Sequence, residues 1–163
     1  MTYEDTATGS AARIGPLLKE RGWTLAVAES CTGGLVGSAI TDVSGSSDYF
    51  VGGVIAYANR IKRDMLGVEE RTLEAHGAVS EEVARAMARG VREALAADVG
   101  LAVTGIAGPT GGTLQKPVGT VFIAVSTPLQ ERAEHHRWSS DRLDNKRLSV
   151  EAVLSLLEKM LSG

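Results

Sequence analysis

The chain has 163 residues, a length that suits one domain of ordinary size and leaves little for a second. Hydrophobic residues make up 44% and charged residues 23%, which excludes a disordered or collagen-like chain. Lys and Arg total 17 against 20 Asp and Glu, a formal charge of −3, and aromatic residues are only 4%, so we expect no nucleic-acid partner.

The first half of the chain alternates between predicted helices and strands. Residues 1–10 are polar and are expected to form a flexible N-terminus, followed by a single domain over residues 11–163. The patterns predict a helix over residues 11–20, a buried strand over 23–28, a helix up to about Thr41 and a second strand over 50–57. Asn59 is a good N-cap for a short helix that Gly67 would end.

The second half has a similar pattern. Apolar residues recur at helical spacing from Ser80, a good N-cap, to about Leu95. Strands are predicted over residues 99–104, 119–126 and 132–138, and a final helix from about Leu143. Alternating strands and helices indicate a layered α/β fold, and the short connection between the last two strands predicts an antiparallel pair within a mixed sheet.

Glycine is enriched, at 19 residues, and two groups of glycines lie in loops after predicted strands. The segment AESCTGG at residues 28–34 places several main-chain N–H groups and a helix dipole beside the Ser30 hydroxyl, which suits an oxyanion or phosphate. The same residues also suit an ordinary tight turn in which Ser30 caps the helix. The second cluster, TGIAGPTGG at residues 104–112, can add the Thr104 hydroxyl to one shared ligand crevice at the carboxyl ends of the strands.

Two nucleophiles are candidates in the first loop. Ser30 needs a base, and nothing in the sequence brings His76, His135 or His136 toward it. Cys31, the single cysteine, would be activated near a helix N-terminus, although a lone cysteine is more often a small buried hydrophobic residue. One cysteine cannot form an internal disulfide, and the chain starts without a signal-peptide pattern or a membrane-length apolar stretch, so we expect a cytoplasmic protein with no membrane partner.

Lys62 is the remaining candidate base. If Asn59 is the N-cap, Lys62 is the third residue of the helix, near the positive end of its dipole and between Arg60 and Arg63. Both effects would lower the pKa of the lysine and let it accept the serine proton, with Tyr57 able to relay or hold that proton. The alternative is an ordinary solvated lysine in the first turn of a helix.

The start of the last helix and the histidines complete the candidate groups. Arg142 can place a guanidinium on a ligand phosphate, or form a cap and a surface ion pair with its neighbour Asp141. Adjacent His135 and His136 would point to opposite faces of a strand, and no metal-binding motif occurs. We expect neither a metal nor a cofactor.

Seven blocks follow one another in the chain: ESCTGG at 29–34, GSS at 45–47, Tyr57 with Asn59 and Lys62, LGV at 66–68, GAVS at 77–80, TGIAGP at 104–109 and KPVGT at 116–120. Together they resemble the C-terminal domain of the CinA (competence/damage-inducible) family over about residues 27–157. The resemblance implies a three-layer α/β/α sandwich on a mixed, mostly parallel sheet and a homo-oligomer. It also implies metal-independent hydrolysis of nicotinamide mononucleotide, a small-molecule substrate, to nicotinate mononucleotide and ammonia.

The resemblance also implies roles for individual residues, with Ser30 as nucleophile assisted by Lys62 and Tyr57. Ala58 departs from the usual serine of its block, and Ser140 stands where the family tends to have glycine. Longer members carry an N-terminal domain that processes nucleotide pyrophosphates, for which we expect no room here. The alternatives are a non-catalytic nucleotide-binding module and a Ser–Lys hydrolase of another small amide. Expected substrate-binding residues are Thr32, Gly33, Gly34, Asn59, Thr104, Gly105, Gly108 and Arg142.

Overall fold

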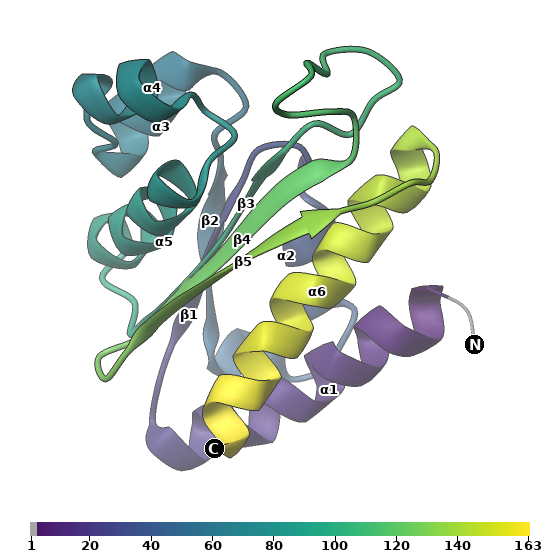
Figure 1. Ribbon diagram of the computed structural model, residues 1–163. Helices are drawn as coiled ribbons and strands as arrows, with labels where there is room; N and C mark the ends of the chain where they lie inside the picture. The colour runs from purple at the N-terminus through teal and green to yellow at the C-terminus, as the bar shows by residue number, and fades with distance from the viewer. Residues whose placement is uncertain (1–2) are drawn as a thin grey trace.

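The computed structural model describes residues 3–163, which form one five-stranded sheet between two layers of helices (Figure 1). Helices α1, α2 and α6 cover one face of the sheet, and α3, α4 and α5 lie over the other. The α/β/α sandwich is therefore confirmed. The helices are α1 (Tyr3–Arg21), α2 (Leu35–Thr41), α3 (Asn59–Leu66), α4 (Glu70–His76), α5 (Glu81–Ala94) and α6 (Arg142–Ser162), with a 3-10 turn η1 (Ser46–Asp48). The strands are β1 (Leu25–Glu29), β2 (Phe50–Ile55), β3 (Val99–Gly105), β4 (Thr120–Ser126) and β5 (Glu131–Arg137).

The strand order in the sheet is β2-β1-β3-β4-β5. β1 pairs in parallel with β2 and β3, whereas β4 is antiparallel to both β3 and β5, so only β4 runs against the others. The predicted antiparallel last pair is confirmed; the antiparallel β3–β4 pair was not foreseen. The glycine-rich segment 106–119 between β3 and β4 contains no helix. Because β4 is antiparallel to β3, it starts at the same end of the sheet at which β3 ends.

Side chains of different size face the two helix layers. Along β1, Leu25 and Val27 point into the core beneath α1, α2 and α6, while Ala26 and Ala28 face α5. Small residues let α5 approach the sheet closely: a Cβ built on Gly100 would lie 2.0 Å from a main-chain oxygen of α5. The tight packing holds the start of α5 beside the carboxyl ends of the strands.

The first helix begins eight residues before its predicted start. Its buried residues Ala7, Ala11, Ile14 and Leu18 recur at helical spacing and belong to the core shared with α6. Polar residues between them hid this stripe in the sequence. Met1 and Thr2, part of the predicted flexible N-terminus, lie outside the described residues. No helix within residues 3–163 is long and apolar enough to cross a membrane.

The helices over the other face differ from the prediction in two details. Ala58, not Asn59, is the N-cap of α3, and it makes no side-chain capping bond, so Lys62 is the fourth residue of the helix. Helix α4 was not predicted. The Ser80 cap is confirmed, since its Oγ accepts a hydrogen bond from the N–H of Val83 at 3.3 Å.

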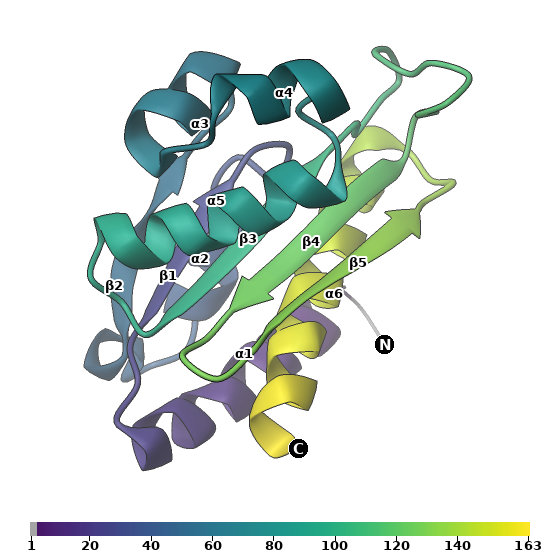
Figure 2. The ribbon, with the colours of Figure 1, turned by 60° about the vertical axis from the view of Figure 1, so that its left-hand side comes forward.

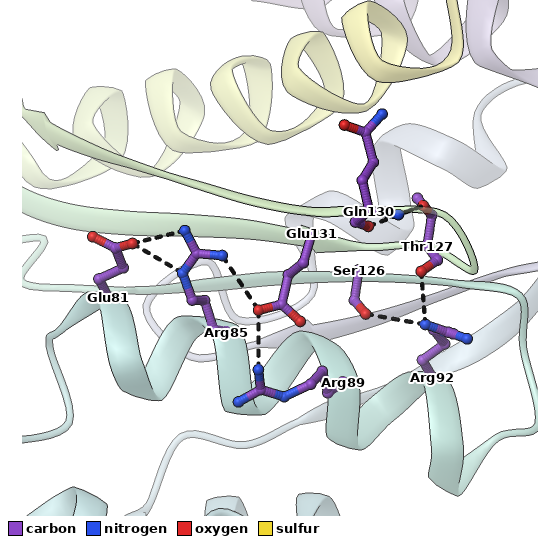
Figure 3. Close-up of polar contacts among 8 residues, drawn as sticks. All are labelled: Glu81, Arg85, Arg89, Arg92, Ser126, Thr127, Gln130 and Glu131. Atoms are coloured by element: carbon purple, nitrogen blue, oxygen red, sulfur yellow. Dashed lines mark hydrogen bonds and ion pairs between the residues drawn. The ribbon is translucent and has the colours of Figure 1, made fainter.

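Arginine side chains of α5 hold the β4–β5 hairpin at one end of the sheet (Figure 3). Arg85 and Arg89 donate to the carboxylate of Glu131 at 3.3 and 3.0 Å. Arg92 donates to the main-chain carbonyl of Thr127 at 2.9 Å. These contacts join the hairpin turn to α5 and leave the opposite end of the sheet for the loops that follow β1, β2 and β3.

Candidate active site

A cleft of about 310 Å³ opens where β1, β2 and β3 end. Both glycine-rich loops contribute to it, together with the start of α3 and the loop before α5. This follows from the parallel order of the three strands, because the segments that leave their carboxyl ends meet at the same edge. The predicted site residues that line the cleft are Ser30, Tyr57, Asn59, Lys62, Thr104, Gly105, Gly108 and Arg142.

A buried serine–lysine pair lies in this cleft. The Nζ of Lys62 is 3.1 Å from the Oγ of Ser30 and donates a second hydrogen bond to the main-chain carbonyl of Tyr57 at 3.1 Å. Lys62 is only 1% exposed and Ser30 7%. Ser30 directly follows β1 and Lys62 lies in the first turns of α3 after the neighbouring strand β2, so the sheet brings together residues that are 32 positions apart.

Burial lowers the pKa of Lys62 because a desolvated ammonium is less stable than the neutral amine. The sequence predicts the same direction from another cause, the helix dipole and the flanking arginines. One of those arginines, Arg63, is instead paired with Asp64 and Glu70 at the surface. A lysine with a lowered pKa has a larger neutral fraction near pH 7 and is a better general base.

Cys31 lies beside the pair but has the opposite character. Its side chain is 7% exposed and belongs to the hydrophobic core. Burial raises the pKa of its thiol to about 12, so the thiolate is scarce at neutral pH. Ser30 is therefore the stronger candidate for the nucleophile, because its hydroxyl contacts the amine of Lys62.

The first glycine turn does not form the expected cradle. Thr32, Gly33 and Gly34 are not among the residues that line the cleft. The N–H of Gly33 donates to the carbonyl of Ser30 at 3.2 Å, and that of Gly34 donates to the Glu29 carboxylate at 3.2 Å. The N–H groups of Gly33 and Gly34 are thus already used within the protein, and the assignment of Thr32, Gly33 and Gly34 to substrate binding stays a prediction.

The anion at this helix end is the chain's own carboxylate. Glu29 is 2% exposed and, besides the bond from Gly34, accepts hydrogen bonds from the N–H groups of Val36 at 2.8 Å and Gly37 at 3.0 Å. Three donors at the start of α2 thus hold a residue adjacent to Ser30. Sequence reasoning missed this role because a glycine-rich turn before a helix has the same pattern whether its anion is a ligand or a side chain.

The second glycine loop is tied to its surroundings by three of the predicted residues. The Oγ1 of Thr104 donates to the carbonyl of Ala78 at 2.9 Å, which fixes the loop before α5. Gly105 has no room for a side chain, since a Cβ there would lie 2.6 Å from a methyl group of β4. Arg142 donates to the carbonyl of Gly108 at 2.6 Å and also lines the cleft.

Asn145 is a structural residue of the site that sequence reasoning missed. It is 1% exposed, and its amide donates to the carbonyls of Ala107 and Ser140, both at 3.0 Å. Its Oδ1 accepts from the N–H of Ser140 at 3.1 Å. The signal was a polar residue among the apolar positions of α6. Because Ser140 takes part here through its main chain, the departure from glycine leaves these bonds in place.

Tyr57 and Asn59 lie at the mouth of the cleft. Tyr57 is 64% exposed, and its contact with Lys62 is made by the main-chain carbonyl. Asn59 is an exposed residue in the first turn of α3. Within residues 3–163, no three His, Cys, Asp or Glu side chains gather in a way that could hold a metal ion.

Fold and cleft together define an α/β/α domain with a buried serine–lysine pair at the carboxyl ends of its parallel strands. Residues 7–161 match the model of the CinA C-terminal domain, and the chain belongs to this family. The resemblance drawn from the seven sequence blocks is confirmed.

Relatives of known sequence include the CinA-like proteins of Salinibacter ruber and Desulfotalea psychrophila. The first is 52% identical over 151 residues, which are 93% of this chain and 37% of that protein. The second is 53% identical over 148 residues, 91% of this chain and 36% of that protein. The chain therefore spans little more than a third of the length of these curated relatives.

Solved structures match the domain over nearly its whole length. The competence/damage inducible protein CihA from Agrobacterium tumefaciens superposes with a TM-score of 0.93 at 38% identity, covering 97% of this chain and 96% of that one. A CinA superfamily protein from Escherichia coli gives a TM-score of 0.91 at 32% identity, covering 98% and 93%.

Proposed function

We propose that the protein is an amidase that hydrolyses the carboxamide of nicotinamide mononucleotide, with Ser30 as nucleophile and Lys62 as general base. The observation that carries the proposal is the 3.1 Å contact between a buried amine and a serine hydroxyl in an open cleft. The site supports the type of reaction, and the family resemblance supports the substrate.

Acylation begins when the neutral amine of Lys62 takes the proton of the Ser30 hydroxyl. The Oγ attacks the amide carbon, and the carbonyl oxygen of the substrate becomes an oxyanion. Cys31 lines the cleft and directly follows Ser30, so its main-chain N–H is the candidate donor to this oxyanion. One well-placed donor contributes about 3–4 kcal/mol. The lysine ammonium then protonates the leaving nitrogen, the C–N bond breaks, and ammonia departs from an ester on Ser30.

Deacylation reverses the proton route. Water gives a proton to Lys62 and attacks the ester carbon, the bond to Oγ breaks, and the proton returns to Ser30 as nicotinate mononucleotide leaves. Tyr57 assists by positioning, because its carbonyl holds the amine of Lys62 at 3.1 Å. This differs from the proton relay through the phenol that the sequence suggested.

The remainder of the nucleotide binds along the second glycine loop. Among the described residues that line the cleft, the basic groups are Lys62 and Arg142. A guanidinium pairs well with a phosphate, and Arg142 is assigned to that group. Thr104, Gly105 and Gly108 shape the wall beside it, and Asn59 lies at the mouth.

Ammonia release from nicotinamide mononucleotide, measured with purified protein in the presence of a chelator, tests the proposal. Ser30→Ala should abolish release and Lys62→Ala should reduce it by about 100-fold to 10,000-fold. Cys31→Ala is the matched control and should stay active. Loss in the cysteine variant alone would overturn the assignment of the nucleophile. Thermal stabilisation by the nucleotide without ammonia indicates a binding module, and turnover of a different amide indicates another substrate.

A further inference from the structure

Two of the seven sequence blocks, GAVS at 77–80 and KPVGT at 116–120, contain no residue to which the proposed function gives a role. The structure brings these blocks together, because the Nζ of Lys116 donates a hydrogen bond to the main-chain carbonyl of His76 at 2.5 Å. His76 ends α4 and directly precedes the first block. Figure 2 shows the segment between α4 and α5 beside the loop between β3 and β4, at the end of the sheet where the cleft opens.

Both segments form walls of the cleft. Ala78 and Val79 line it from the segment before α5, and residues 106–108, 110 and 111 line it from the loop after β3. Lys116 lies behind these walls, where it lines a neighbouring cavity of about 340 Å³ together with Val79. The Lys116 side chain therefore acts on a bound substrate through the position of the walls.

Both ends of this contact are fixed by the main chain. Lys116 closes a tight turn with Thr113, whose N–H donates to the Lys116 carbonyl at 2.8 Å and whose Oγ1 accepts from the Lys116 N–H at 3.0 Å. At the other end, Gly77 has a φ of 76°, and a Cβ there would lie 3.0 Å from the Nζ of Lys116. A larger residue would strain this backbone and press on the ammonium group. The His76 carbonyl is also one of the last in α4, where the helix dipole favours a positive charge.

We propose that Lys116 is a positioning residue that sets the width of the cleft, by holding the segment before α5 against the loop after β3. The role rests on the proposed function, because it concerns binding of the nucleotide between these walls. The bond from Thr104 to the Ala78 carbonyl joins the same segment to the end of β3, so loss of the Lys116 ammonium loosens the wall without detaching it. Ser30 and Lys62 lie on other elements, after β1 and in α3, so the chemical step should change little.

Steady-state kinetics of ammonia release test this role. Lys116→Met nearly keeps the length of the side chain but removes the ammonium group. It should raise KM for nicotinamide mononucleotide about tenfold and leave kcat within about threefold, because a charged hydrogen bond that positions the wall is lost. Lys116→Arg keeps a cation and should recover most of the wild-type KM. Lys159→Met, at an exposed lysine in the last turn of α6, is the matched control and should leave both constants unchanged. An unchanged KM in Lys116→Met, or a fall in kcat as large as the rise in KM, overturns the proposal.

Hydrogen–deuterium exchange followed by mass spectrometry gives a readout that needs no turnover. In Lys116→Met, peptides that cover residues 73–80 and 106–116 should exchange about tenfold faster than in the wild type, because the contact between these segments is lost. A peptide over the last turns of α6 should exchange at the wild-type rate. Unchanged exchange in both segments means that the ammonium group holds neither wall, and overturns the positioning role. If the wild type releases no ammonia, the proposed function fails, and the exchange rates still show whether Lys116 joins the two walls.

Discussion

Replacement of Lys62 by methionine separates the chemistry of the amine from its packing. Methionine has nearly the same length and fills the same buried space, so the fold should be kept. The variant loses the amine that contacts Ser30 and should release ammonia about 100-fold to 10,000-fold more slowly. Its stability should also respond differently to pH.

The sign of that response follows from burial, which lowers the pKa of Lys62 below its ordinary value of 10.5. Between the lowered folded value and 10.5, the unfolded chain holds a proton that the folded chain has released. The free energy of unfolding of the wild type therefore gains a contribution that rises with pH across this window, by up to about 1.4 kcal/mol per pH unit. The methionine variant lacks the contribution, so its stability relative to the wild type falls as the pH approaches 10.5.

Urea denaturation of both proteins between pH 7 and pH 10, followed by circular dichroism, measures the difference. Ser30→Ala is the control, because it keeps the buried amine and should retain the pH-dependent contribution while losing activity. If the unfolding free energies of wild type and methionine variant run parallel over this range, the folded protein holds a charged amine and the general-base role of Lys62 is refuted.

Three further substitutions test the supports of the site. Glu29→Gln puts an amide N–H group against a main-chain donor such as that of Gly37. Two donors then face each other, so the free energy of unfolding measured in urea should fall by about 1–3 kcal/mol. Unchanged stability would contradict the role of the Glu29 carboxylate as the acceptor at the start of α2. Asn145→Ala removes the hydrogen bond to the Ala107 carbonyl and should lower the free energy of unfolding by about 2–3 kcal/mol. It should also raise KM for the nucleotide more than it lowers kcat, and an unchanged KM would show that this bond does not support the cleft. Cys31→Ala should keep its activity within a few-fold, and thiol reagents at pH 7 should not inactivate the native wild type, because burial raises the pKa of the thiol to about 12. Rapid inactivation would contradict this.

Most of the elements could be predicted from short-range pattern. The helix after Ser80 and its cap follow from apolar spacing and a hydroxyl in the right place, and the structure has both. Two of the errors fall where a helix end depends on distant contacts. The first turns of α1 are held in the core shared with α6, and Ala7 is the one apolar core residue that marks them in the sequence. Asn59 has a good capping side chain, yet the path of the chain after β2 starts the helix with Ala58 as the cap.

For the candidate site, too, part could be predicted from the sequence and part could not. Residue types and spacing selected Ser30 and Lys62 as candidates, the family resemblance implied their roles as nucleophile and base, and the seven blocks identified the family. The lowered pKa of Lys62, its 3.1 Å contact with the serine and the filling of the α2 N-terminus by Glu29 were decided by tertiary structure. Helix and strand preferences act over a few neighbouring residues, whereas desolvation and reach depend on what distant segments bring to the same place. A lysine in the first turns of a helix becomes a base only where the surrounding sheet, loops and helices exclude water from it.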